Sequence, residues 1–145
     1  METKGFTSIT VEATVNAPVD KVWDCWAKPE HITQWTFASP DWHAPFAEND
    51  LRKDGGFKTT MAAKDGSFSF DFEGIYTDVV EHRKISYVLG DGRTVNIMFK
   101  PQNEFTIVTE TFDAETENPI EMQKDGWQSI LDNFKKYVEL SNDRH

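Results

Sequence analysis

The sequence contains a single cysteine, Cys25, and only four histidines among its 145 residues. One cysteine cannot form an intramolecular disulfide. The histidines are scattered, and none follows a metal-binding spacing such as HExxH; they are His31, His43, His82 and His145. A zinc cluster needs several Cys or His ligands at fixed spacings, so that class of site is excluded. We therefore expect neither a metal nor another cofactor.

Long apolar runs are also missing. No stretch approaches the length that is needed to span a bilayer. The first five residues, Met1–Gly5, lack the apolar stretch of a secretory signal peptide. We expect a protein of the reducing cytoplasm.

Basic residues are fewer than acidic ones: the chain has 15 Lys and Arg but 25 Asp and Glu, which gives a formal net charge of −10. A field of this sign repels phosphate backbones and anionic lipid surfaces. General binding to nucleic acids or membranes is therefore not expected. The sequence leaves the oligomeric state open.

Aromatic residues are abundant, at 13% of the chain, which argues against disorder. The length predicts one domain over residues 1–145. A domain of this size buries roughly 70% of the surface that its unfolded chain exposes, enough for a sizeable core.

The first 35 residues predict a strand and two helices. Residues 7–15 alternate between apolar and polar side chains, which indicates a half-buried strand. Pro18 suits the start of a helix because its fixed φ fits the first turn. One apolar stripe follows, formed by Val19, Val22, Trp23 and Trp26. Pro29 ends this helix and opens a second short one, which we expect to carry Ile32 and Trp35.

The remainder predicts a meander and a final helix. Residues 36–56 form an irregular loop rich in aromatic residues, with a short strand possible near 48–52. Turn signals then separate five strands, at 57–63, 67–80, 85–89, 94–100 and 105–113. Gly74 interrupts the second of these and predicts a bulge or bend. A long helix starts near Asn118 and Pro119, and its apolar residues recur with helical spacing up to Val138.

This order predicts an α+β fold in which a sheet of six or seven antiparallel strands buries one face against the long helix. A sheet that bends around one helix can leave a tunnel between them. On that helix, Gly126 next to Trp127 has no side chain, at a position where close packing or a void would matter. Ordinary packing without a void is the alternative.

Motifs at both ends of the chain carry a family resemblance. Residues 17–23, with Trp26, 29–31 and Trp35, resemble the opening of the START-like (SRPBCC, helix-grip) superfamily. More narrowly, four segments resemble the heat-shock-protein-90 ATPase activator homologue family. They are residues 41–43, 47–52, 72–74 and 126–134. The likeness covers about residues 7–139. It implies a curved sheet that grips the C-terminal helix, a cavity between them, and short helices and a 36–46 loop near the cavity mouth.

Two polar positions stand out as candidate sites. His43 lies near Asp41 and Glu48 in sequence and could act as a general base, or simply anchor the loop by hydrogen bonds. Glu110 lies between Val108 and Phe112 on one strand face. If that face is the inner one, burial would raise the pKa of Glu110 and make it a ligand anchor or an acid; a rim position or an ion pair is the alternative. Cys25 is expected to be a buried structural thiol.

We expect a cavity that binds a small hydrophobic or aromatic molecule, because ligand pockets are mainly apolar with a few polar groups. The candidate cavity residues are Trp26, Trp35, Phe37, Trp42, His43, Glu48, Phe70, Phe72, Tyr87, Glu110, Trp127, Ile130 and Phe134. Two other functions stay open. One is a protein-interaction module of the chaperone-cofactor kind, and the other is a cyclase- or aromatase-like enzyme that uses His43 or Glu110.

Overall fold

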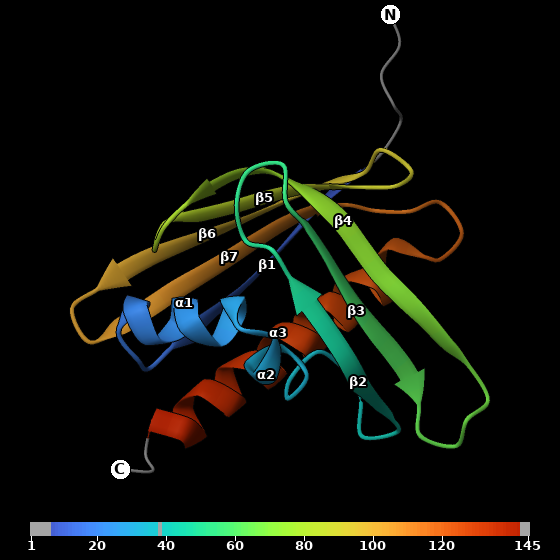
Figure 1. The fold of residues 1–145 in the computed structure, drawn as a ribbon, viewed down its shortest axis with the longest axis horizontal. Helices are drawn as coiled ribbons and strands as arrows, with labels where there is room; N and C mark the ends of the chain where they lie inside the picture. The colour runs from blue at the N-terminus through green and yellow to red at the C-terminus, as the bar shows by residue number, and fades with distance from the viewer. Residues whose placement is uncertain (1–6, 38, 143–145) are drawn as a thin grey trace, which may run out of the picture.

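A curled antiparallel sheet and one long helix dominate the computed structural model, which describes residues 7–37 and 39–142 (Figure 1). Met1–Gly5 and His145, considered above, lie outside the described residues. In chain order the elements are β1 (Ser8–Val15), α1 (Val19–Ala27), α2 (Pro29–Ile32), β2 (Trp42–Asn49), β3 (Gly56–Ala63), β4 (Ser69–Val80), β5 (Lys84–Leu89), β6 (Thr94–Gln102), β7 (Phe105–Asp113) and α3 (Ile120–Asn142).

The sheet has seven strands in the order β1-β7-β6-β5-β4-β3-β2, and every neighbouring pair is antiparallel. The first and second strands therefore lie at opposite edges. The predicted α+β helix-grip fold is confirmed: the sheet curves around α3, and the two short helices follow β1 (Figure 1).

The core lies between the inner face of the sheet and α3. Every second residue of β1 and β7 is buried, as it is from Val95 to Phe99 in β6, and Val11, Ile97 and Val108 are at most 2% exposed. From α3, the fully covered side chains of Phe134 and Val138 pack into the same cluster. Burying one such side chain stabilises the fold by about 1.5–3 kcal/mol, so the long helix is held by its apolar stripe rather than by its ends.

The structure corrects the prediction for residues 36–56. Most of this segment was expected to be loop, with a short strand near 48–52, yet Trp42–Asn49 form a full edge strand. Its pairing with β3 shifts register between His43 and Phe46, around Pro45. Proline is tolerated in sheets at edges and bulges, and the irregular register removes the apolar alternation that would have revealed the strand.

Two smaller expectations also need correction. Trp35 lies beyond the four-residue α2, in the turn that follows it, and its indole Nε1 donates a hydrogen bond to the Cys25 carbonyl at 3.0 Å. Gly74 marks no bulge, because its pairing continues on both sides, and the register shift comes between Tyr76 and Asp78. A Cβ at Gly74 would lie 2.8 Å from the Val88 carbonyl oxygen, so the glycine permits a close approach of neighbouring strands.

Within residues 7–37 and 39–142, no helix combines the length and apolar character required to cross a bilayer.

Candidate functional site

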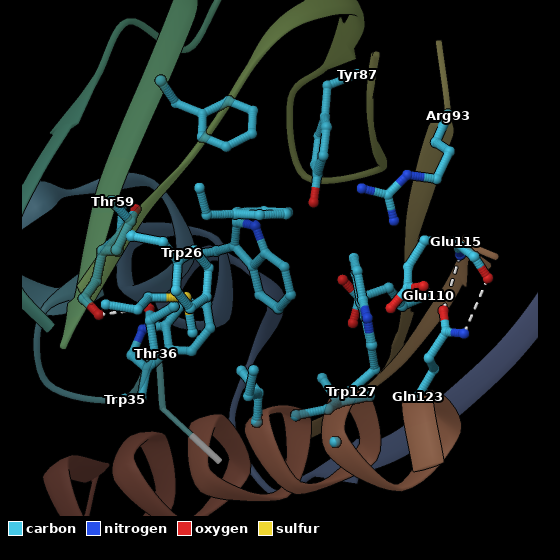
Figure 2. Close-up of a pocket in the computed structure, with 18 of the residues that line it drawn as sticks. Trp26, Trp35, Thr36, Thr59, Tyr87, Arg93, Glu110, Glu115, Gln123 and Trp127 are labelled. Atoms are coloured by element: carbon cyan, nitrogen blue, oxygen red, sulfur yellow. Dashed lines mark hydrogen bonds between the residues drawn. The ribbon is translucent and has the colours of Figure 1, made fainter. Parts of the chain in front are cut away.

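A cavity of about 460 Å³ lies between the curled sheet and α3 (Figure 2). A single water needs roughly 10–15 Å³ by this kind of measure, and small-molecule sites span about 300–1,000 Å³. The lining comes from all three helices, from strands β2 to β5 and β7, and from the connections after α2, β5 and β7. The space therefore has the size of a ligand site rather than of a packing defect.

One end of the cavity is aromatic. Trp26 of α1 and Trp35 face the space, and their ring centroids lie 4.9 Å apart. Phe134 of α3 packs behind both, at 4.9 Å from Trp26 and 4.7 Å from Trp35. We call Trp26 and Trp35 the aromatic end. Such edge-to-face contacts add about 0.5–1.5 kcal/mol each beyond area burial, so this wall is rigid.

Polar side chains gather at the opposite end (Figure 2). They are Tyr87 of β5, Arg93 of the β5–β6 turn, Glu110 of β7, Glu115 of the β7–α3 connection and Gln123 of α3. We call these five residues the polar end. The cavity thus has a largely apolar body with a cluster of polar groups at this end, while Thr36, Asn49 and Thr59 border it elsewhere.

Glu110 is the most unusual member of the polar end. Its side chain points inward between Val108 and Phe112, and the residue is only 6% exposed. Burial raises the pKa of its carboxyl to about 8, because the charged form loses its hydration. The neighbouring Tyr87 hydroxyl has a pKa well above its usual value, mainly through burial and then through the negative charge of Glu110.

The other polar-end groups are already engaged. Arg93 Nε donates a hydrogen bond to Asp91 Oδ2 at 2.7 Å. Gln123 accepts a hydrogen bond from the Glu115 backbone N–H at 2.9 Å and donates one to the Glu115 carbonyl at 3.0 Å. Hydrogen bonding, first of all by Asn118, lowers the pKa of the Glu115 carboxyl. This end is therefore preorganised.

Helix α3 shapes one border of the cavity with a ridge of residues four apart, Met122, Gly126 and Ile130. A Cβ built at Gly126 would meet no atom within 4 Å. The missing side chain therefore leaves open space in the lining, in line with the expected tunnel rather than with packing that leaves no void.

Eight of the thirteen predicted cavity residues line this space, and they are Trp26, Trp35, Phe70, Phe72, Tyr87, Glu110, Trp127 and Ile130. Five do not. Phe134 lies in the core behind the aromatic end, and Phe37 is half-buried beside the Asn133 side chain. Trp42 packs on Phe68 and Phe70, outside the lining.

His43 and Glu48 lie on the edge strand β2 with exposed side chains. His43 borders a separate hollow at the β3–β4 hairpin. Among the residues that the structure describes, His43 makes no ion pair or hydrogen bond with Asp41 or Glu48, and no group of three potential metal ligands occurs. The structure thus separates His43 from Glu110. Cys25 is a buried free thiol, as predicted, and burial raises its pKa.

Sequence reasoning missed more than half of the lining. The additional residues are Ile32, Thr36, Asn49, Phe57, Thr59, Met61, Tyr76, Arg93, Glu115, Asn118, Met122, Gln123, Gly126 and Leu131. A signal existed for some of them. Phe57, Thr59 and Met61 share one strand face by simple alternation, and Leu131 lies next to Ile130 on the apolar stripe of the last helix.

Comparisons with known proteins agree with this fold. Residues 16–139 match the family model described as Activator of Hsp90 ATPase homolog 1-like protein. The solution structure of the AHSA1-like protein from Aeromonas hydrophila is 44% identical, with a TM-score of 0.88 over 96% of this chain and 97% of that one. A search of curated proteins gave no match.

Two further solved structures extend the comparison. A protein from Cytophaga hutchinsonii is 51% identical over 95% of this chain and 96% of its own, with a TM-score of 0.80. A protein from Nitrosomonas europaea shares only 19% identity over 93% of this chain and 96% of its own, and its TM-score of 0.79 shows a common fold alone. With its helix-grip fold of the START-like superfamily, the chain therefore belongs to the Activator of Hsp90 ATPase homolog 1-like family.

Proposed function

We propose that this protein binds a small hydrophobic or aromatic molecule in the cavity between the sheet and α3. The observation that carries the proposal is the cavity itself, about 460 Å³ in volume and lined largely by apolar and aromatic side chains. Water gains little in such a space because few polar partners surround it. A ligand that buries apolar surface there gains about 25 cal/mol for each Å² removed from water.

The arrangement of the lining supports a ligand with an apolar body and a polar group at one end. Trp26 and Trp35 line the aromatic end, and Phe72 and Trp127, which pack edge-to-face with ring centroids 6.0 Å apart, add a second aromatic part of the wall. Rings in the ligand would meet rings in the wall edge-to-face or offset, as aromatic groups prefer. Affinity would come from the apolar body, and the polar end would set the orientation.

A chaperone-type partner is the second candidate function, and the description of the matched family model is what favours it. Its test is the ATPase rate of the host's own chaperone of the Hsp90 class with and without this protein. An unchanged rate and no co-purification would remove this candidate.

For a cyclase-like enzyme, of the two predicted acid or base residues only Glu110 lies in the cavity, since His43 borders a separate hollow. A cytoplasmic location stays a prediction from the sequence.

Native mass spectrometry of the protein purified from its own host tests the binding proposal. We expect a stoichiometric adduct of defined mass that is released on denaturation. The matched control is Gly126→Phe, which adds a ring to the lining at a position where a Cβ meets no neighbour. An adduct that persists unchanged in this variant would not occupy the cavity, and the proposal would fail.

A further inference from the structure

Among the residues that the structure describes, the Glu110 carboxyl has no hydrogen-bond partner, and it borders the cavity. The residue is 94% covered, since only 6% of its surface is exposed. Buried carboxyl groups are normally paired, because an unpaired one costs several kcal/mol. A carboxyl left unpaired beside a ligand-sized space therefore points to a partner that comes with the ligand.

The charges around Glu110 decide what kind of partner fits. Tyr87 of β5 interacts with it electrostatically, and Arg93 of the β5–β6 turn and Glu115 of the β7–α3 connection line the same end of the cavity. The one cation, Arg93, is already bonded to Asp91, and Glu115 adds a second carboxylate. The described lining contributes no lysine or histidine. With Glu110 ionised, the polar end carries a surplus of negative charge.

We propose that the ligand carries a basic head group, an amine or amidine, which the Glu110 carboxylate binds at the polar end, while a ring-containing apolar body fills the aromatic end. This inference rests on the proposed function and names the chemical class of its ligand. The formal charge of −10 on the chain favours approach of a cation over an anion.

Aromatic rings near Glu110 also favour a cationic head group. Trp127, which stacks on Phe112, and Tyr87 both line the cavity. A cation over the face of such a ring gains about 0.5–2 kcal/mol, more when it is desolvated. The head group would therefore meet one carboxylate and two aromatic rings.

The protonation state of Glu110 before binding predicts a measurable release of protons when a cation binds. Its raised pKa keeps the carboxyl protonated near neutral pH, and Tyr87, Arg93 and Glu115 are the titratable groups that surround it. A cationic head group stabilises the ionised form instead. Binding of an ammonium ion near pH 7 should therefore release roughly one proton from Glu110 to the solvent. A neutral ligand of the same shape should release none.

Three probes with one body and different heads test the inference. They are phenylbutylamine, phenylbutanol and phenylbutanoate, titrated calorimetrically into the protein near pH 7 in two buffers of different ionisation enthalpy. We expect the amine to bind about tenfold or more tighter than the alcohol, the range of a charge-assisted hydrogen bond, with release of a proton. The carboxylate should bind most weakly.

Two variants test whether Glu110 causes the preference for the amine. Glu110→Gln keeps the shape of the side chain and should bring the amine to the affinity of the alcohol, without proton release. Glu104→Gln removes the same charge from an exposed turn and should leave the preference unchanged. The dispersion of amide resonances verifies that both variants fold. Retention of the amine preference in Glu110→Gln would overturn the assignment to this residue.

The outcomes separate this inference from the proposed function. Equal affinities for the three probes, or tightest binding of the carboxylate, would overturn the basic head group while the binding function stands. Binding of no probe at millimolar concentration would count against both.

Discussion

Trp127 of α3 stacks flat against Phe112 of β7, with ring centroids 3.9 Å apart and planes inclined by only 10°. Phe112 follows Glu110 by two residues on the same strand face. The stack therefore fixes the distance between helix and sheet next to the buried carboxyl. The polar end of the cavity owes its geometry to this contact.

Replacement of Trp127 should affect both stability and binding. We expect Trp127→Ala to lower the free energy of unfolding by about 3 kcal/mol, because it removes a large packed side chain and leaves Phe112 without its stacking partner. Trp127→Phe should cost much less. The control is Trp42→Ala, which removes a half-buried tryptophan outside the cavity and should cost about 1 kcal/mol. Urea unfolding measures all three, and equal losses at positions 127 and 42 would contradict the role of the stack.

Two glycines should respond to alanine with opposite signs. At Gly126 in α3 a Cβ meets nothing within 4 Å, so Gly126→Ala should stabilise the protein by up to about 1 kcal/mol through helix propensity. At Gly74 a Cβ would lie 2.8 Å from the Val88 carbonyl oxygen and 3.0 Å from the Phe57 ring. Gly74→Ala should therefore destabilise by about 1–3 kcal/mol. Thermal unfolding of both variants gives the comparison, and a shift of the same sign in each would refute it.

A short hydrogen-bond chain ties α1 to the sheet beside the cavity. Tyr76 donates to Asn49 Oδ1 at 2.5 Å, and Asn49 Nδ2 donates to the Ala27 carbonyl at 2.6 Å. Asn49→Ala should cost about 1–3 kcal/mol, because the Tyr76 hydroxyl, on a side chain only 5% exposed, then has no acceptor.

Tyr76→Phe is the matched variant for this chain. It removes the hydroxyl and leaves the Asn49 to Ala27 bond in place, so its cost should be smaller, about 1 kcal/mol. Chemical denaturation compares the two variants. A larger loss for Tyr76→Phe than for Asn49→Ala would place the stabilising contact elsewhere.

The strand period placed Glu110 on one face with Val108 and Phe112 but left open whether that face was the inner one. The structure shows that it is, since both apolar residues are at most 1% exposed. Helical spacing identified Trp127 and Ile130, which now line the cavity. Where a strong period runs through an element, the sequence alone determines which side chains share a face. Most of the fold follows from such periods.

Edge strands and turns were less predictable. The face of His43 depends on the irregular register around Pro45, which no local alternation reveals. Arg93 reaches the cavity from a tight turn, where its direction follows from Gly92 at a φ of 93° and from its bond to Asp91. Such positions depend on pairing between segments that are distant in sequence, so the complete lining required the structure.

The buried carboxyl gives the last prediction, a dependence of stability on pH. In the unfolded chain Glu110 ionises with a pKa of 4.5, whereas the folded chain raises this pKa to about 8. Between these values the folded state keeps a proton that the unfolded state has lost. The free energy of unfolding should therefore fall as pH rises, by up to about 1.4 kcal/mol per pH unit. The contribution of Glu110 is complete below pH 4.5 and lost above about pH 8.

Glu110→Gln isolates this contribution because glutamine carries no titratable proton. Urea unfolding of the wild type and the variant across this pH range should show two curves that diverge, with the variant the more stable toward pH 8. Glu104→Gln, at an exposed position, should follow the wild-type slope. Parallel curves for Glu110→Gln and the wild type would mean that the carboxyl stays hydrated in the folded protein. The same result would remove the basis for proton release on binding an amine.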